Sequence, residues 1–393
     1  MVTKITSWPC FSSEEVQAVS ATITSNKVNY WTGDIGRKFE QEYANWTGVH
    51  HAIALANGTV ALDLALKALC IGPGDEVIVT PRTFIASVSS VVTTGATPVF
   101  ADVEPDSGNI SPRTINAVIS DHTKAIIPVH LGGWPCDMAG IMKLANQHDL
   151  FVIEDCAQAH GAKVGEAMVG SLGHVGAWSF CQDKIMTTGG EGGMVTTNDE
   201  DLWNRMWSYK DHGKSWDAVY NREHPPGFRW VHESFGTNWR MLEMQAAIGR
   251  IQLKRMNEWT ALRTRNARAL QAVLQEFPGI VRVPDPDPGF THAYYRQYGY
   301  IKQDGLKSGW TRDRIVEDIA AQGYPAFQGS CSEVYLEKAF DGTGWRPEKR
   351  LPIARELGET SIMLLTHPSI TEEQIEVYCN AVRQTLEKAT RQG

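Results

Sequence analysis

The sequence predicts an α/β protein with a mostly parallel sheet, helices on both faces of that sheet, and a smaller α/β domain after it. From Gly48 to Asp211 short apolar runs alternate with helical patterns, and this alternation is typical of parallel sheets. After Gln245 the pattern changes to long helical spacing and then to mixed short elements. The length of 393 residues is enough for two or three domains. We therefore expect a large domain over residues 1–258, with residues 1–25 packed on the small domain, and a small domain over residues 259–393.

The elements of the large domain follow from the spacing of apolar residues. Apolar runs predict strands at residues 51–56, 76–79, 98–101, 124–129, 151–154, 177–180 and 193–197. Amphipathic spacing predicts helices at residues 59–69, 85–94, 111–119, 137–147 and 202–211. Gly72, Pro73 and Gly74 follow the first of these helices and end it, because neither residue type continues a helix.

The rest of the chain has a different pattern. Residues 245–276 predict one long helix or two, and Phe277, Pro278 and Gly279 end it. A strand at residues 294–301 and helices at residues 311–322 and 371–387 follow. Between Gly213 and Phe235 lies a polar and aromatic insertion that is too irregular for the sheet. A binding loop and a plain surface excursion both fit this insertion.

Composition excludes several classes of protein. Lys and Arg number 37 against 45 Asp and Glu, a net charge of −8, which argues against a sequence-independent nucleic-acid binder. No apolar stretch approaches the length that spans a membrane, and the first residues lack the apolar run of a signal peptide. The seven cysteines are widely spaced and form no CxxC pair. We therefore expect no disulfide framework, no metal, no membrane partner and a cytoplasmic location.

Polar residues gather where predicted strands end, which is where ligands bind in parallel sheets. Asn57, Gly58 and Thr59 lie between a strand and a helix; they suit a phosphate cradle, although they would also cap a helix. Phe84 follows the next strand, and its ring could stack on a planar ligand or pack in the core.

A third segment carries adjacent carboxylates. Glu154 and Asp155 end an apolar strand, with Gln158 and His160 close behind. Successive strand residues face opposite ways, so only one of the two carboxylates can point into a given pocket. Such a carboxylate could pair with a protonated ring nitrogen, and Asp155 could also merely cap a helix.

A fourth segment carries a lysine. Ser179 ends a strand, Lys184 follows it, and a glycine-rich turn follows Lys184. A lysine that can lose its proton is a candidate for Schiff-base chemistry, although a surface lysine beside a flexible loop has the same pattern. Taken together, a phosphate cradle, a stacking ring, a carboxylate for a ring nitrogen and an amine for an aldehyde are what pyridoxal phosphate requires.

At this point the sequence resembles the DegT/StrS family of sugar aminotransferases. The segments that carry the resemblance are residues 57–62, 72–77, 83–86, 95–99, 129–131, 153–161, 179–184, 190–193 and 238–241. The resemblance implies the aspartate-aminotransferase architecture of fold type I, a large domain with a mostly parallel seven-stranded sheet and a smaller α/β domain. It also implies a homodimer whose active site is shared between subunits.

The resemblance implies a role for each matching residue. Lys184 is expected to form a Schiff base with the cofactor and to move protons, and Asp155 to keep the ring nitrogen protonated. The expected cofactor-binding residues are Gly58, Thr59, Phe84, Asp155, Gln158, Ser179, Lys184 and, from the partner subunit, Asn238. The expected substrate-binding residues are Trp31, Thr32, His130, His212 and Arg240.

Three positions refine the resemblance. Relatives that dehydrate a sugar carry His where this chain has Lys184, so transamination is favoured. Cys156 stands where the family usually has Ala, and Cys181 lies between Ser179 and Lys184. We interpret both cysteines as small residues of the pocket wall rather than as nucleophiles.

The expected reaction moves the amino group of L-glutamate to a nucleotide-linked keto-sugar for surface-polysaccharide synthesis. The leading acceptor is C4 of a UDP-linked 4-keto-6-deoxy-2-acetamido hexose. Alternatives are C3 amination of a dTDP- or UDP-linked 3-keto sugar, and C4 amination of a dTDP- or GDP-linked 4-keto-6-deoxy sugar. Two other classes of protein are alternatives: a regulator that binds the cofactor without catalysis, and an enzyme acting on amino acids, for which Arg296 could bind a carboxylate.

Overall fold

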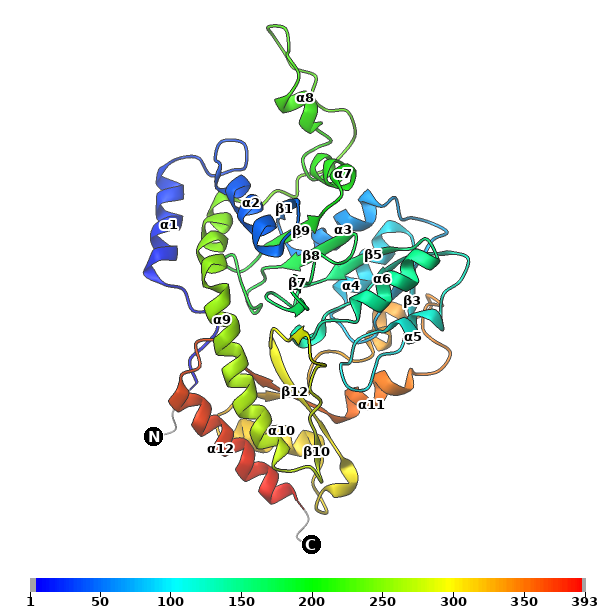
Figure 1. Cartoon of the computed structure of the whole chain (residues 1–393), viewed down its shortest axis with the longest axis vertical. Coiled ribbons are helices and arrows are strands. Elements are labelled where there is room, and N and C mark those ends of the chain that lie inside the picture. The colour runs from blue at the N-terminus through cyan, green and yellow to red at the C-terminus, as the bar shows by residue number, and fades with distance from the viewer. Residues whose placement is uncertain (1–4, 391–393) are drawn as a thin grey trace.

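The computed structural model describes residues 5–390, and its largest element is a seven-stranded sheet in the order β1-β9-β8-β5-β4-β2-β3 (Figure 1). The strands are β1 (His51–Leu55), β2 (Glu76–Val79), β3 (Thr97–Phe100), β4 (Thr123–Ile127), β5 (Phe151–Asp155), β8 (Val175–Ser179) and β9 (Gly193–Thr197). Strand β9 pairs antiparallel with β1 and β8, and all the other pairs are parallel. The predicted mostly parallel sheet is confirmed.

Helices cover both faces of this sheet because its strands are apolar on both sides. In β2, Val77 and Val79 pack in one core cluster and Ile78 packs in another, as the two-residue period of a strand requires. The first face is covered by α3 (Gly58–Ala68), α4 (Ala86–Thr94) and α7 (Glu200–Lys210). The other face is covered by α2 (Ile35–Thr47), α6 (Met138–Gln147) and α9 (Glu243–Gln275). A short helix, α5 (Pro112–Asn116), precedes β4.

Helix α9 is a single helix of 33 residues, which settles whether this segment forms one helix or two. It runs from the large sheet to a four-stranded antiparallel sheet made of β10 (Val281–Arg282), β12 (Arg296–Ile301), β14 (Ser361–Leu365) and β13 (Ala326–Phe327). Helices α10 (Arg312–Ala321) and α12 (Glu372–Ala389) enclose a separate core with this sheet, and α11 (Pro352–Thr360) precedes β14. The expected domain boundary after residue 258 lies within α9 and stays a prediction.

The sequence did not predict α1 (Ser13–Thr24), which packs along α9. Its start is fixed by the Glu15 side chain, which accepts hydrogen bonds from Ser12 and Gln252 and pairs with Arg255. Gln252 and Arg255 are far from Glu15 in the sequence, so local pattern could not show these two contacts, whereas Ser12 and Glu15 form a capping box that is visible in the sequence. Before α1, Ile5 packs on the core of the small sheet.

The remaining short elements connect these layers. A three-stranded sheet contains β11 (Phe290–Thr291), β6 (Lys163–Val164) and β7 (Ala167–Met168). Short 3₁₀ turns occur at Leu131–Gly133, Gln303–Gly305, Val334–Leu336 and Lys338–Phe340.

The insertion after α7 projects from the body of the molecule as an arm that contains α8 (Trp216–Tyr220), at the top of Figure 1. As expected, it takes no part in the large sheet. Phe228, Trp230 and Phe235 expose 75%, 83% and 100% of their surface on this arm. Within residues 5–390, no helix is both long and apolar enough to cross a membrane.

Candidate functional site: a cavity around Lys184

A cavity of about 600 Å³ lies at the carboxyl ends of the strands of the large sheet. It is lined by seven of the residues that the sequence singled out for a cofactor: Gly58, Thr59, Phe84, Asp155, Gln158, Ser179 and Lys184. They come from four separate stretches of the chain and meet because the strands that carry them end at the same edge of the sheet. The position of this site was therefore predictable from topology.

One end of the cavity is built to hold an anion. The Asn57 side chain accepts a hydrogen bond from the Val60 amide at 3.0 Å and caps α3, while the first amides of a helix have no helical acceptor. Gly58 packs so closely on β8 that an added Cβ would lie 2.6 Å from the Ser179 Cβ. The Ser179 hydroxyl accepts from the Cys181 amide, so its proton is free to be donated. Neutral donors at a helix N-terminus suit a phosphate.

Asp155 lines the cavity, and its carboxylate accepts few hydrogen bonds. Its carboxylate accepts a hydrogen bond from the Ser87 hydroxyl at 2.7 Å and from the Ala157 amide at 3.1 Å. Burial raises the pKa of Asp155 above its usual value. A cationic N–H placed against this carboxylate would favour its charged form.

Ser87 is a residue of the site that sequence reasoning missed. Because its proton goes to Asp155, its oxygen accepts the hydroxyl proton of Thr83 at 2.8 Å. Ser87 lies one helical turn after Phe84, on α4, so it shares the edge that Phe84 marks. That spacing was the signal that could have found it.

Lys184 lies between the two sheets. Its Nζ is 3.7 Å from a carboxylate oxygen of Asp183 and 5.4 Å from the centre of the Tyr295 ring, and its side chain is 18% exposed. Its backbone carbonyl accepts a hydrogen bond from the Trp8 indole at 2.8 Å. The amine is thus held in the cavity instead of projecting into solvent.

Two further side chains in the cavity, Gln158 and Phe84, have groups available to contact a ligand. The Gln158 side-chain oxygen accepts a hydrogen bond from the Gly132 amide at 2.8 Å. This contact fixes the orientation of the side chain and leaves its NH₂ group to donate. The Phe84 ring is 69% exposed although it lines a cavity, and a planar ligand would cover it.

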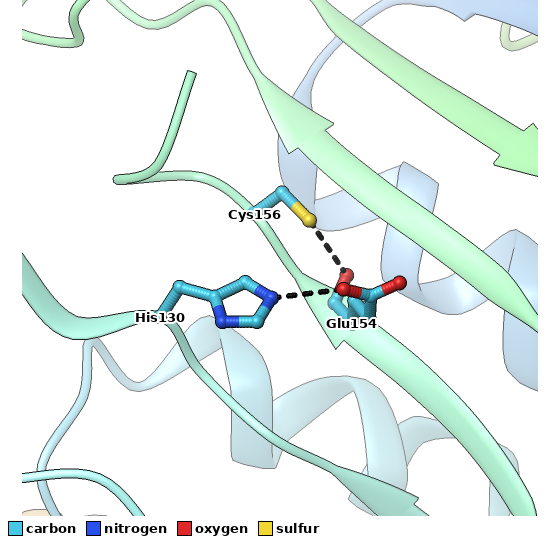
Figure 2. Close-up of side chains that lie close together, drawn as sticks. All are labelled: His130, Glu154 and Cys156. Atoms are coloured by element: carbon cyan, nitrogen blue, oxygen red, sulfur yellow. Dashed lines mark hydrogen bonds and ion pairs between the residues drawn. The ribbon is translucent and has the colours of Figure 1, made fainter. Parts of the chain in front are cut away.

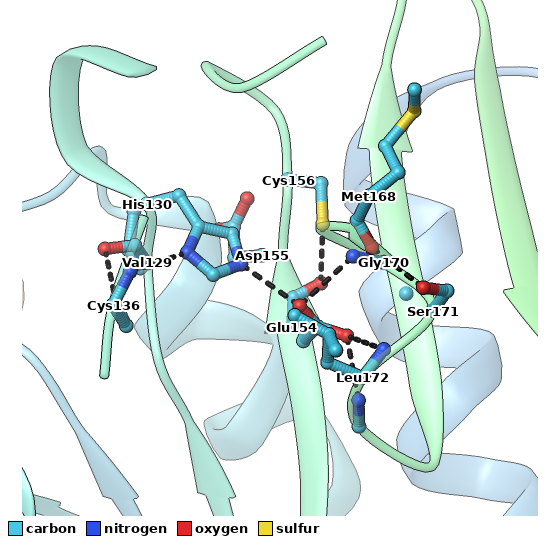
Figure 3. Close-up of polar contacts among 12 residues, drawn as sticks. Val129, His130, Cys136, Glu154, Asp155, Cys156, Met168, Gly170, Ser171 and Leu172 are labelled. Carbon is cyan, nitrogen blue, oxygen red and sulfur yellow. Dashed lines mark hydrogen bonds and ion pairs between the residues drawn. The ribbon is translucent and has the colours of Figure 1, made fainter. Parts of the chain in front are cut away.

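Glu154 faces away from the cavity, as the alternation of strand residues predicts. Its carboxylate accepts hydrogen bonds from the amides of Gly170, Leu172 and Gly173 and from the ring of His130 (Figure 3). Glu154 therefore ties the loop before β8 to β5, the strand that delivers Asp155.

The structure does not bring His130 to the cavity, which argues against the expected contact with substrate. The ring is fully buried, and its Nδ1 accepts a hydrogen bond from the Cys136 amide at 2.9 Å. The ring proton is therefore on Nε2, which donates to Glu154 at 3.0 Å. This pairing depends on which strands are neighbours, so the residues around His130 gave no local sign of it.

His130, Glu154 and Cys156 lie close enough to be considered as metal ligands (Figure 2). The acceptor atoms of this cluster are already occupied, since Glu154 receives four hydrogen bonds and His130 is used at both nitrogens. Burial, with the charges of Glu154 and Asp155, raises the pKa of the Cys156 thiol far above its usual value. This donor set fits a network that holds strands together better than a metal centre.

The two cysteines are placed differently. Cys181 lines the cavity, as expected. Cys156 is fully buried in the core that packs α2 and α9 on the sheet, so it is not among the residues of the cavity wall. Its side chain therefore replaces a small core residue.

The other predicted substrate residues form a second group outside this cavity. The buried carboxylate of Asp211 accepts hydrogen bonds from the Trp31 indole at 2.8 Å and from Arg240 at 2.6 Å. Three more residues predicted for the site, Thr32, His212 and Asn238, are exposed to solvent. In the sequence they lie within two positions of Trp31, Asp211 and Arg240. None of the five lines the cavity around Lys184 in the same chain.

These features fit pyridoxal phosphate. The helix N-terminus at Gly58 lies this close to Ser179 only because Gly58 has no Cβ. Asp155 supplies a buried carboxylate, Phe84 an exposed ring and Lys184 an amine, and all three line the same cavity.

Comparison with known proteins agrees with this geometry. A model of the DegT/DnrJ/EryC1/StrS aminotransferase family matches residues 9–383. GDP-perosamine synthase of Caulobacter vibrioides is 39% identical over 363 residues, 91% of this chain and 92% of that protein. UDP-N-acetyl-3-dehydro-α-D-glucosamine 3-aminotransferase of Acidithiobacillus ferrooxidans is 37% identical over 355 residues, 90% of this chain and 89% of that protein.

A solved structure extends the agreement to the whole fold. The aminotransferase from Psychrobacter cryohalolentis superposes with a TM-score of 0.97 at 60% identity, covering 98% of this chain and 99% of that one. An enzyme is therefore favoured over a regulator without catalysis. The chain belongs to the DegT/DnrJ/EryC1/StrS family of aminotransferases, which use pyridoxal phosphate as their cofactor.

Proposed function

We propose that this protein transfers the amino group of L-glutamate to a keto-sugar carried on a nucleotide. The observation that carries the proposal is the cavity in which Lys184, Asp155 and the Gly58 cradle meet. Its support from the comparisons is that two relatives, at 39% and 37% identity, are named for amino-sugar synthesis on nucleotides.

Each residue of the cavity has a separate role in the proposed reaction. When bound, the cofactor withdraws electrons from the carbon that carries the amine. Asp155 holds the proton on the ring nitrogen, and the Ser87 hydroxyl fixes the orientation of that carboxylate. Gly58, Thr59 and Ser179 hold the phosphate, Gln158 donates its NH₂ group to the ring oxygen, and Phe84 covers one ring face. The Lys184 amine moves a proton onto or off the substrate carbon.

For the acceptor we propose a UDP-linked 4-keto-6-deoxy-2-acetamido hexose, aminated at C4, in surface-polysaccharide synthesis. Amination at C3 of a 3-keto sugar is the second candidate, favoured by the relative that is named as a 3-aminotransferase. The names of the two relatives contain different nucleotides, GDP and UDP. The nucleotide and the aminated carbon are therefore both measured in the experiment below.

We also propose that the protein is a homodimer in the cytoplasm and that each active site is completed by Asn238 and Arg240 of the other copy. Asn238 is exposed outside the cavity of its own chain. The aromatic side chains on the arm at residues 213–235 are unusually exposed for a monomer. All seven cysteines lie within the described residues and are free, in agreement with a reducing compartment.

The shared site can be tested by mixing two inactive dimers. Lys184→Ala and Asn238→Ala affect different halves of one proposed site, so a mixed dimer contains one intact site. We expect each variant alone to be inactive and the re-equilibrated mixture to recover up to about a quarter of wild-type activity, because half of the dimers are mixed and each has one intact site of two. Activity of Asn238→Ala alone, or no recovery in a mixture shown to exchange subunits, would refute the shared site.

The reaction is tested by incubating the cofactor-loaded protein with L-glutamate and a panel of keto-sugar nucleotides, followed by mass spectrometry and NMR. The expected result is an amino sugar in which NH₂ and H replace the keto oxygen, formed from one nucleotide-linked sugar and at one carbon, with 2-oxoglutarate in equal amount. Lys184→Ala is the matched control and should give neither product. Formation of 2-oxoglutarate without amination of any sugar would contradict the proposed acceptor.

A further inference from the structure

We propose that Asn109, which lies outside the cavity, orients Gln158 toward the cofactor by holding the glycine turn (residues 131–134). The inference rests on the proposed function, in which Gln158 donates its NH₂ group to the ring oxygen of pyridoxal phosphate. Asn109 does not line the cavity around Lys184, so it is a positioning residue that acts through Gln158. The inference can therefore fail while the role of Gln158 stands.

One hydrogen bond decides which end of the Gln158 side chain faces the ligand. Its Oε1 accepts a hydrogen bond from the Gly132 amide at 2.8 Å, and no other hydrogen bond of this side chain occurs within residues 5–390. The two ends of a carboxamide have nearly the same shape, but one only accepts and the other only donates. A side chain turned end for end would present an acceptor to the ring oxygen of the cofactor, which is itself an acceptor. The Gly132 amide prevents this, because an N–H group pairs only with the oxygen.

The Gly132 amide belongs to a turn that does not fix its own shape. Within the glycine turn, Leu131–Gly133 is a single 3₁₀ turn, and both of its glycines have positive φ angles, 63° at Gly132 and 96° at Gly133. Glycine reaches many backbone conformations at little steric cost, so contacts from outside the turn must select this one. An added Cβ at Gly132 would lie 2.9 Å from the Tyr298 ring on β12, so no larger residue fits there without a shift.

Asn109 supplies such contacts on both sides of Gly132. It lies in the loop between β3 and α5 and is 2% exposed. Its Oδ1 accepts a hydrogen bond from the Leu131 amide at 3.1 Å, and its NH₂ group donates to the Trp134 carbonyl at 2.9 Å. Apart from Gln158, no other side chain in the described part of the chain forms a hydrogen bond with the backbone of the glycine turn. The two contacts bracket Gly132 and hold its amide toward Gln158.

A backbone contact keeps the turn in place when Asn109 is replaced. The Ala293 amide donates a hydrogen bond to the Gly133 carbonyl at 2.8 Å, and this bond uses no side chain. Replacement of Asn109 should therefore loosen the Gly132 amide, and with it the orientation of Gln158, while the turn itself persists.

Cofactor binding in a double-mutant cycle tests the proposal without turnover. Pyridoxal phosphate is titrated into the cofactor-free protein and followed by absorbance. We expect Asn109→Ala to weaken binding about three- to tenfold, the range of one neutral hydrogen bond. In a protein that carries Gln158→Leu, the same change should alter binding less than about twofold, because the side chain through which Asn109 acts is gone. Asn109→Asp should weaken binding as well, because a carboxylate cannot donate to the Trp134 carbonyl.

The absorbance spectrum separates positioning from general damage. A donor at the ring oxygen favours the negatively charged form of that oxygen, so its loss should raise the pH midpoint at which the absorbance of the bound cofactor changes. We expect Gln158→Leu and Asn109→Ala to raise this midpoint, Asn109→Ala by less. The control is Asn266→Ala, since Asn266 is also buried and donates to two backbone carbonyls but does not line the cavity. It should lower the thermal midpoint and leave both cofactor measurements unchanged.

The outcomes distinguish the role of Asn109 from that of Gln158. Equal effects of Asn109→Ala with and without Gln158→Leu would overturn the proposal, because Asn109 would then act on the whole site. Wild-type binding by Asn109→Ala, together with weakened binding by Gln158→Leu, would overturn it too and leave the role of Gln158 standing. Wild-type binding by Gln158→Leu would refute the proposed role of Gln158 itself, and this inference with it.

Discussion

Replacing Gly58 by Ala tests the phosphate cradle directly. A Cβ at this position would lie 2.6 Å from the Ser179 Cβ, 3.0 Å from its hydroxyl oxygen and 3.1 Å from its Cα. Ordinary van der Waals contact begins at 3.4 Å, so α3 and β8 must separate by nearly an ångström. Two of these atoms are Cα and Cβ, which cannot rotate away. The added methyl group therefore pushes the Gly58 and Thr59 amides away from the Ser179 hydroxyl.

The loss can be estimated from the hydrogen bonds involved. A hydrogen bond to a charged group contributes about 1.5–3 kcal/mol, and loss of one such bond weakens binding about 10- to 150-fold. Overpacking lowers the free energy of unfolding by about 1–3 kcal/mol in addition. Titration of the cofactor-free protein with pyridoxal phosphate, followed by absorbance, measures the first effect, and thermal unfolding measures the second.

The matched control is Gly279→Ala, because a Cβ there meets nothing within 4 Å and its backbone is not in the left-handed region. We expect this variant to bind the cofactor as the wild type does. Wild-type affinity in Gly58→Ala would refute the reasoning, since the helix and the strand would then not form one cradle.

Other predictions concern the carboxylates of β5 and the buried histidines. Asp155→Asn should lower kcat about a hundredfold or more while thermal unfolding stays nearly unchanged, because Asn cannot supply the charge that holds the ring proton; full activity would contradict this role. Glu154→Ala should lower the free energy of unfolding by about 3–5 kcal/mol in urea titrations, because it leaves three amides and one ring N–H unpaired; a change below about 1 kcal/mol would contradict it. Burial is the main cause that lowers the pKa of His160, His292 and His367 to about 3. Between pH 6.5 and 3 the unfolded chain binds protons that the folded chain does not, so stability should fall as the pH falls, by up to about 1.4 kcal/mol per pH unit for each histidine. His160→Gln should reduce the slope in urea titrations across this range, and an unchanged slope would contradict the burial argument.

Much of the fold and the cofactor-binding residues of the site could be predicted because the sequence patterns that mark them are local. The strands ending at Asp155 and Ser179 were marked by apolar runs, and parallel topology then brought their ends to one edge. The alternation of strand residues separated Asp155, which faces the cavity, from Glu154, which faces His130.

What could not be predicted depended on contacts between distant parts of the chain. Helix α1 is held by the pairing of Glu15 with Arg255, 240 residues apart. His130 lies next to an apolar run, but its burial follows from its pairing with Glu154 on the neighbouring strand. Asp183 and Arg296 meet across the two sheets, and neither residue carries a local signal of that contact.

The most direct test of the central claim is to locate the cofactor on the chain. The protein is loaded with pyridoxal phosphate, reduced with borohydride, digested, and analysed by mass spectrometry. The account predicts one modified residue, Lys184, and no modification at Lys210 or Lys214, which pair with carboxylates near the arm. Modification of a different lysine, or no retained cofactor at all, would contradict it.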